Sequence, residues 1–217
     1  MTLRLRTRLT DQLRILGRSE VAANPGVQGN ERLTAMAGAV LFVLLAAEGV
    51  TIPQVRSLFL AHAFIGVMLV GPLSVKLGST GYRFFRYYAG SGTYRTKGPP
   101  KPLLRLLAPV LVASTVAVVG TGIALLVSGP GSDSFLIGLH KASFYVWFAV
   151  TTVHVLAYVW RVPGLVLREL SKVGGPQVPG SQTRLMIVGV GVTAGVVAGI
   201  AALPAIATWT TWFNAVR

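Results

Sequence analysis

Apolar residues along this chain are concentrated in five long runs, which are separated by short segments rich in polar and basic residues. A helix that crosses a lipid bilayer needs roughly 20 consecutive, mostly apolar residues. The five runs lie at residues 33–55, at 57–75, between Arg105 and Asp133, at 135–160, and from Arg184 to about residue 207. The pattern predicts an all-α integral membrane protein, with a single bundle of five transmembrane helices at residues 33–217.

The segment before the first run is basic and lacks the apolar core of a secretory signal peptide. Leu9, Leu13 and Leu16 recur at helical spacing among arginines. This spacing is typical of an amphipathic helix on a membrane surface. Residues 1–32 are therefore predicted to form a cytoplasmic, basic, amphipathic tail.

Basic residues are distributed unequally between the two sides of the predicted bundle, and loops rich in Lys and Arg face the cytoplasm. The tail and the connections between runs two and three and between runs four and five hold most of them. The opposite side holds only Arg56, Lys141 and Arg217. We therefore expect a cytoplasmic N-terminus and an external C-terminus, in a bacterial plasma membrane.

Composition agrees with this interpretation. Hydrophobic residues make up 53% of the 217 residues and charged residues only 12%, whereas soluble domains carry about 25% charged residues. The absence of cysteine excludes disulfides, cysteine-bound iron–sulfur clusters and covalent haem attachment through a Cys-x-x-Cys-His motif. The net charge of +14 would favour nucleic-acid binding in a soluble protein, but here it is attributed to membrane topology.

Two further patterns concern packing and the membrane surface. Gly191, Gly195 and Gly199 repeat at every fourth position, and small residues at this spacing allow helices to approach closely. We expect packing within the bundle rather than dimerisation. Residues 82–88 mix arginine with tyrosine and phenylalanine, a combination that directly after a span favours the interfacial aromatic belt over a nucleic-acid site.

All three histidines of the chain, His62, His140 and His154, fall within predicted spans. Ionisable groups are costly at membrane depth, so each is a candidate functional residue. The alternative for an isolated histidine is an interhelical hydrogen bond.

The spacing of His140 and His154 favours two separate cofactors. Their 14 positions fall only about 40° short of four helical turns and rise about 21 Å. Both rings therefore leave the same helix face at different depths, too far apart for a single metal ion. Two planar cofactors stacked across the membrane would fit, and haem iron accepts imidazole as an axial ligand.

The second run offers partners at matching depths. Lys76 follows His62 by 14 positions, and runs two and four cross the membrane in the same direction. His62 should therefore lie level with His140, and Lys76 level with His154. The alternative for Lys76 is that it ends the span and extends to the surface.

Small and charged residues near these positions could complete the two sites. Gly66 lies one turn after His62, where a missing side chain would let a flat ring approach the backbone, and Gly71 could serve likewise. Candidate partners of haem propionates are Arg56 and Lys141 on the external side, and Arg83, Tyr158 and Arg161 on the internal side. Ordinary membrane anchoring is the alternative for each cation.

The stretch from Leu139-His140-Lys141 to Val153-His154-Val155 resembles the ligand helix of membrane di-haem b-type cytochromes. That group includes the cytochrome b subunit of quinol–cytochrome c reductases, small bacterial cytochrome b electron carriers and ferric-reductase-like membrane domains. The resemblance covers about half of the chain, and it implies a four-helix bundle that holds two haems b between pairs of axial ligands. Lys76 departs from the family pattern, which has a histidine there.

The resemblance also implies electron exchange with a quinone or a partner oxidoreductase, although the chain has no flavin or nicotinamide motif. Whether the protein is an electron carrier or the membrane subunit of an enzyme stays open, as does assembly into an oligomer or larger complex. Glu48, within the first run, is a candidate for proton exchange at an external quinone site, or for pairing with Arg56. Two other functions stay open: a transporter or proton relay, and a haem-free scaffold with structural histidines.

Overall fold

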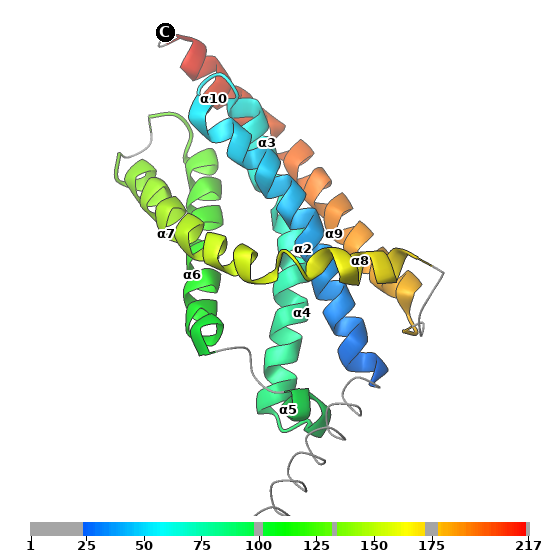
Figure 1. The fold of residues 1–217 in the computed structure, drawn as a ribbon. Helices are drawn as coiled ribbons and strands as arrows, with labels where there is room; N and C mark the ends of the chain where they lie inside the picture. Colours follow the sequence, from blue (N-terminus) through cyan, green and yellow to red (C-terminus); the bar gives the residue numbers. More distant parts are fainter. Residues whose placement is uncertain (1–23, 98–101, 132–133, 172–177, 216–217) are drawn as a thin grey trace, which may run out of the picture.

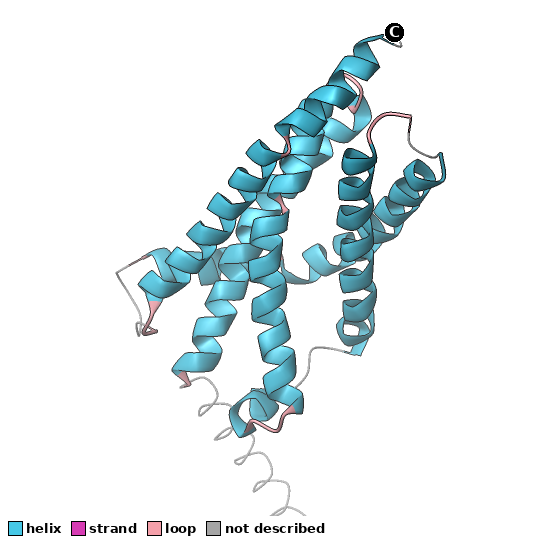
Figure 2. Cartoon of the chain, turned by 180° about the vertical axis from the view of Figure 1, so that it is seen from behind, coloured by secondary structure: helices cyan, strands magenta, loops and turns pink. Residues whose placement is uncertain are grey.

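A computed structural model describes residues 24–97, 102–131, 134–171 and 178–215, and its regular elements there are all helical (Figure 1; Figure 2). The α-helices are α2 (Pro25–Thr51), α3 (Phe59–Met68), α4 (Val70–Tyr88), α5 (Gly92–Lys97), α6 (Pro102–Ser128), α7 (Ser134–Tyr158), α8 (Val162–Leu170), α9 (Ser181–Ala201) and α10 (Leu203–Ala215), with one 3-10 turn at Ile52–Gln54.

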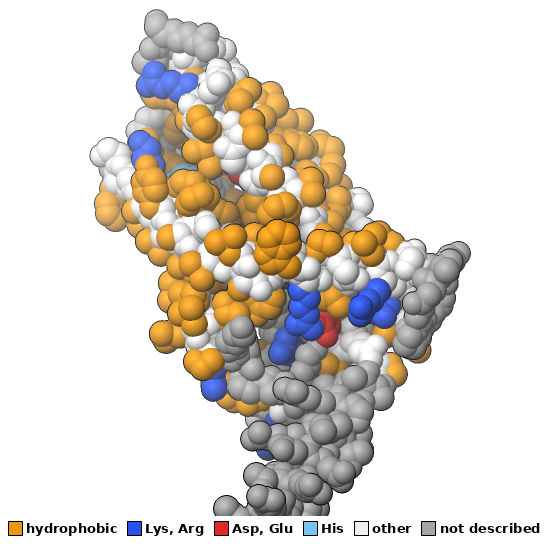
Figure 3. Space-filling view, in the orientation of Figure 1, with side chains coloured by type: hydrophobic (Ala, Val, Ile, Leu, Met, Phe, Trp, Pro, Cys, Tyr) orange, Lys and Arg blue, Asp and Glu red, His pale blue; other side chains and the backbone are white. Residues whose placement is uncertain are grey.

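The five-span prediction is confirmed. The helical segments long and apolar enough to cross a membrane are Pro25–Gln54, Phe59–Tyr88, Pro102–Ser128, Ser134–Tyr158 and Ser181–Ala201. Large apolar side chains cover the outside of the bundle, as Figure 3 shows, and Val127 is 80% exposed. An apolar exterior is what a lipid environment requires. We call the end where arginines gather, near Pro25 and Tyr88, the basic end.

The first span begins earlier than its apolar run. The Asn24 side chain accepts hydrogen bonds from the backbone N–H groups of Gly26 (3.0 Å) and Val27 (3.2 Å), and proline occupies the first helical position. Both features are favourable at a helix N-terminus. Arg32, assigned to the tail from sequence, therefore belongs to α2, and the predicted amphipathic helix at residues 9–16 lies outside the described residues.

The second span, Phe59–Tyr88, is locally irregular at Leu69, which separates α3 from α4. Leu69 keeps helical backbone angles, and Pro72 follows in the first turn of α4. Proline has no backbone N–H, so it cannot donate to the Met68 carbonyl four residues earlier. α4 then continues to Tyr88, well past the predicted end at residue 75, so that residues 82–88 are helical.

The glycine stripe of α9 packs on this interrupted span, as predicted. A Cβ atom at Gly195 would overlap the Met68 carbonyl that Pro72 leaves without its helical partner, and one at Gly199 would lie 2.9 Å from the Phe64 ring. The missing side chain of Gly71 faces the backbone of Gly191. Gly71 therefore serves helix packing, and its predicted role beside a cofactor is wrong.

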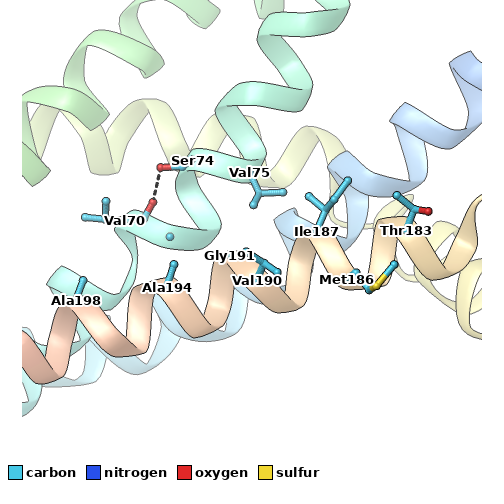
Figure 4. A pocket seen from close by; sticks show the side chains of 11 residues that line it. Val70, Ser74, Val75, Thr183, Met186, Ile187, Val190, Gly191, Ala194 and Ala198 are labelled. Atoms are coloured by element: carbon cyan, nitrogen blue, oxygen red, sulfur yellow. Dashed lines mark hydrogen bonds between the residues drawn. The ribbon is translucent and has the colours of Figure 1, made fainter.

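A groove between α4 and α9 lies beside this contact (Figure 4). It is lined mainly by aliphatic side chains and glycine, and the Ser74 hydroxyl at its edge donates to the Val70 carbonyl (2.8 Å). A lining of this kind is suited to lipid contact.

Replacing Gly195 with alanine should destabilise the bundle by about 1–3 kcal/mol, the usual cost of overpacking. The added methyl group would have to displace the Met68 backbone. Thermal unfolding in detergent measures the effect. Gly189→Ala is the matched control, because a Cβ there meets nothing within 4 Å. Equal melting temperatures for the two variants would contradict this account of the packing.

Helices α6 and α7 form a hairpin whose members pack chiefly on each other, and α6 also contacts α3 and α10 (Figure 1). Helix α8 follows α7 directly and crosses α2. The hairpin is thus joined to the rest of the bundle mainly through α6 and α8.

A buried carboxylate fixes α8 in place. The Glu169 side chain is 0% exposed and accepts from Arg32 of α2 (3.0 Å) and Arg184 of α9 (2.7 Å). Arg184 also donates to the carbonyls of Val178 (2.9 Å) and Pro179 (2.7 Å). Figure 3 shows the basic and acidic side chains gathered beside α8. Glu169 therefore ties three helices together.

Candidate functional site

His62 on α3 is held through one ring nitrogen by two residues of α2. Its Nδ1 lies 2.9 Å from a Glu48 carboxylate oxygen and 3.0 Å from the Thr51 hydroxyl. Because the Thr51 hydroxyl donates to the Glu48 backbone carbonyl (2.6 Å), its oxygen is left to accept. Both partners thus favour the tautomer with the proton on Nδ1, and Nε2 is the nitrogen able to bind a metal.

Glu48 is the carboxylate of this group, and its side chain is only 13% exposed. One oxygen pairs with His62, whereas the other, Oε2, is buried and has no hydrogen-bond partner among the described residues. Arg56, the alternative partner expected from sequence, is exposed. The structure thus connects Glu48 to a candidate ligand instead.

His140 on α7 shows the same arrangement with a different acceptor. Its Nδ1 lies 3.0 Å from the hydroxyl of Thr121 on α6. The Thr121 hydroxyl donates to the Ala117 carbonyl (2.6 Å), so it accepts from Nδ1–H and again leaves Nε2 as the metal-binding nitrogen. Gly122 makes room for the ring, because a Cβ there would lie 3.2 Å from the His140 Cε1 atom. His140 interacts electrostatically with His62, its expected partner.

At the second level, Lys76 lies against α2 rather than extending to the surface. Its Nζ donates to the Thr34 carbonyl (2.8 Å), and a Cβ at Gly38 would lie 2.8 Å from this amine. His154 interacts electrostatically with Lys76, and its ring centroid is 5.0 Å from that of Tyr158. Each expected pair thus consists of residues on different helices that are near enough for their positive charges to repel each other when both are protonated.

The supporting residues predicted from sequence are placed less favourably. Gly66 faces α2, where a Cβ would lie 3.7 Å from a Glu48 carboxylate oxygen. Arg56 and Lys141 are exposed, and Arg161 pairs with Glu31. Arg161 therefore already has an acidic partner. Among the described contacts, Arg56 and Lys141 have no acidic partner, so they could bind an anionic group.

The inner face of α7 between the two histidines is mostly aromatic and apolar. Trp147 is half-buried, whereas Tyr145 and Thr152 are exposed. The Thr151 hydroxyl is buried and has no hydrogen-bond partner among the described residues. A proton relay along α7 would need a series of inward-facing polar groups. Thr151 is such a group, but the residues around it on this face are mostly aromatic and apolar, so the arrangement does not favour a relay.

Two threonines of the site were not identified from the sequence. Thr121 lies 10 residues before the midpoint of the α6–α7 connection and His140 lies 9 residues after it, whereas Thr51 is the last residue of α2 and His62 lies in the first turn of α3. Antiparallel neighbours at equal distance from a turn lie at similar depth. Similar depth therefore narrows the search to hydroxyl residues near each histidine, but it does not decide which of them meets the ring.

Comparison with known proteins yielded no match among protein-family models, curated proteins or solved structures. The chemistry of the site therefore rests on the residues themselves. A metal ion that is bound directly by side chains usually needs a group of three or more such ligands. Within the described part of the chain, His, Asp and Glu form no such group. Haem iron is held in its macrocycle and needs only axial ligands from the protein.

Proposed function

We propose that this membrane protein is a b-type cytochrome that transfers electrons across the bilayer between two haems, to or from a quinone or a partner oxidoreductase. The observation that carries the proposal is the shared state of His62 and His140. Each donates its Nδ1 proton to an acceptor, which is how metal-binding histidines are usually fixed in tautomer and orientation.

The outer site is supported by its donor set. His62 and His140 come from different helices, interact electrostatically and both keep Nε2 for the iron. Glu48 would orient His62 and increase its basicity, while Thr121 would orient His140. A bound haem supplies reversible one-electron transfer at its iron.

The inner site rests on His154 and Lys76. A lysine amine can coordinate iron only when it is neutral. In that form it has two N–H groups and one lone pair, so donation to the Thr34 carbonyl leaves the lone pair available. Thr34 would then orient Lys76 much as the other acceptors orient the histidines.

Lys76→Met and Lys76→His should both alter the absorption spectrum and midpoint potential of the inner haem and leave the outer haem unchanged. Methionine replaces an amine with a thioether, and histidine replaces it with imidazole, so the axial field changes in both cases. Potentiometric titration followed by absorbance measures this. Arg168→Met, at an exposed basic residue of α8 with no proposed haem role, is the control. Wild-type spectra and potentials in both Lys76 variants would show that Lys76 is no ligand.

Glu48→Gln should weaken binding of the outer haem by about 10–100-fold, the usual effect of removing an outer-shell carboxylate. Loss of a negative charge beside His62 also favours the reduced iron, so the midpoint potential should rise. Haem transfer to an excess of apomyoglobin reports affinity, and redox titration reports potential. Glu31→Gln, in the same helix but paired with Arg161, is the control. Unchanged affinity and potential would contradict this role of Glu48.

Electron exchange with quinone is tested in liposomes containing the purified protein. Addition of a membrane-soluble quinol should reduce the haems, and the reduction should slow in Glu48→Gln if that carboxylate also accepts protons from quinol. The proposal places the basic end in the cytoplasm of a bacterial cell, following the distribution of arginine and lysine.

A haem-free structural role is the second candidate, and one observation favours it. His62 bridges α3 and α2, and His140 bridges α7 and α6, so each ring joins two helices without any cofactor. Under that alternative, histidine variants lose stability but the wild-type protein carries no haem. Haem content therefore separates the two functions.

A further inference from the structure

Three arginines lie where α4 ends, in α5 and at the start of α6: Arg86, Arg95 and Arg105, called here the arginine cluster. Figure 1 shows where these helices lie. All three are exposed. They belong to three successive helices, and α5 packs beside the end of α4. The cluster is thus a surface built by the fold at the basic end of the bundle.

The described partners of the arginine cluster are all uncharged. Arg105 donates to the Tyr88 hydroxyl (2.7 Å), and Arg95 to the Tyr87 carbonyl (3.4 Å). Arg86 lies near the Ser91 hydroxyl (3.4 Å) and over the Tyr94 ring, 5.9 Å from its centroid. A guanidinium group has five N–H donors. Among the described residues, these contacts use only a few of the cluster's donors and do not balance its charge.

The described acidic residues are engaged elsewhere. Glu48 pairs with His62, Glu169 with Arg32 and Arg184, and Glu31 with Arg161. These carboxylates belong to the haem-site region and to the contact between α8 and α2. Charge complementarity therefore calls for an anion from outside this part of the chain.

Exposed aromatic rings adjoin the arginine cluster on α4. Phe84 is 65% exposed and Phe85 67%, and Tyr82 and Tyr88 are each 51% exposed. Aromatic side chains of membrane proteins concentrate at the level of the lipid headgroups. The 30-residue segment Phe59–Tyr88 is about 45 Å long at 1.5 Å per residue, more than the hydrocarbon thickness of about 30 Å. Its end therefore reaches the headgroup layer.

We propose that the arginine cluster binds the phosphate group of an anionic phospholipid, while Phe84 and Phe85 contact the lipid beneath the headgroup. Guanidinium matches phosphate in a bidentate geometry, and basic pockets between transmembrane helices are known to accept anionic headgroups. This site lies apart from the histidines, so it stands whether or not the chain carries haem.

The test is native mass spectrometry of the full-length protein in detergent, titrated with equal amounts of phosphatidylglycerol and phosphatidylcholine. The wild type should retain phosphatidylglycerol preferentially. Each single variant, Arg86→Gln, Arg95→Gln or Arg105→Gln, should weaken phosphatidylglycerol binding by about fivefold, as expected from about 1 kcal/mol per basic residue. Arg168→Gln, at an exposed arginine on α8 outside the cluster, should bind as the wild type does.

Two further arms separate the lipid from other anions. Glycerol phosphate and polyglutamate, added in excess, should not displace the lipid, because neither offers acyl chains to the exposed aromatic rings. Phe84→Ser should weaken retention of phosphatidylglycerol while preserving the melting temperature. Equal retention of the two lipids, unchanged binding in all three cluster variants, or displacement by glycerol phosphate or polyglutamate would overturn the proposal.

Discussion

Alanine at either His62 or His140 is expected to remove roughly one haem per chain, because a b-type haem is held by axial ligation and packing alone. The chain has no cysteine that could attach the macrocycle covalently. Each variant removes one of the two imidazoles proposed for the same iron. The two variants should therefore lose the same spectral component, and haem per polypeptide measured in the purified proteins quantifies the loss.

The matched control uses the second level of the same helix. His154→Ala should remove or alter only the inner haem, because it lies 14 positions from His140 on α7. His140→Gly with added imidazole should regain the outer haem's absorption, since free imidazole can occupy the space of the missing ring. If His62→Ala and His140→Ala keep wild-type haem content and spectra, these residues do not form a common site.

Removing the Glu169 carboxylate should produce the largest loss of stability. Breaking a buried ion pair by deleting one partner costs about 3–5 kcal/mol, because the other charge stays buried without compensation. Here Glu169→Ala would leave Arg32 and Arg184 without their acidic partner, although their side chains are only 12% and 8% exposed. Chemical or thermal unfolding in detergent measures the difference.

Glu31→Ala is the appropriate comparison for Glu169→Ala. Its partner Arg161 is 59% exposed, and ion pairs at the surface are worth about 0–1 kcal/mol. A loss in Glu169→Ala no larger than in Glu31→Ala would show that the buried carboxylate is not the main attachment of α8.

The same carboxylate predicts acid lability. Burial alone would raise the pKa of Glu169, but hydrogen bonds from Arg184, Arg32 and Ser181 outweigh burial and hold the pKa below its ordinary value. Since the pKa is lower in the folded state, the stabilisation is complete above the unfolded value of about 4.3 and is lost as pH falls through the folded value. Glu169→Gln should flatten this acid limb of the stability curve. If the stability of Glu169→Gln falls as steeply at acidic pH as that of the wild type, groups other than Glu169 cause the acid lability.

The spans were predictable because lipid imposes one dominant requirement, a long apolar helix. The glycine stripe of α9 was predictable for a similar reason, since small residues at every fourth position leave one close-packing face. The irregularity between α3 and α4 at Leu69 was not anticipated, although Pro72 carries the signal for it. Helix α8 was also missed, because its nine residues are too short to span and its position depends on the buried charge of Glu169.

For the candidate site, sequence spacing predicts the pairs His62 with His140 and Lys76 with His154, and these pairings stay predictions. Equal depth on parallel spans is fixed by helix geometry, so His62 with His140 and Lys76 with His154 could be paired without coordinates. The hydrogen-bond acceptors could not be assigned in this way, because rotation of each helix about its axis decides which side chains meet. Thr121 and Thr51 were therefore missed, and the pairing of Glu48 with His62 was not anticipated beside its two expected roles, proton exchange at a quinone site or pairing with Arg56.

The central claim, that this bundle binds haem between its histidines, is tested most directly by a reduced-minus-oxidised absorption spectrum of the purified full-length protein, with haem quantified per polypeptide. The protein should be produced in cells supplied with haem precursor. The account predicts a Soret band, a reduced α-band typical of b-type haem, and about two haems per chain, one for each ligand pair. A colourless protein that is folded and monodisperse, and that gains no Soret band on incubation with haemin, would contradict it.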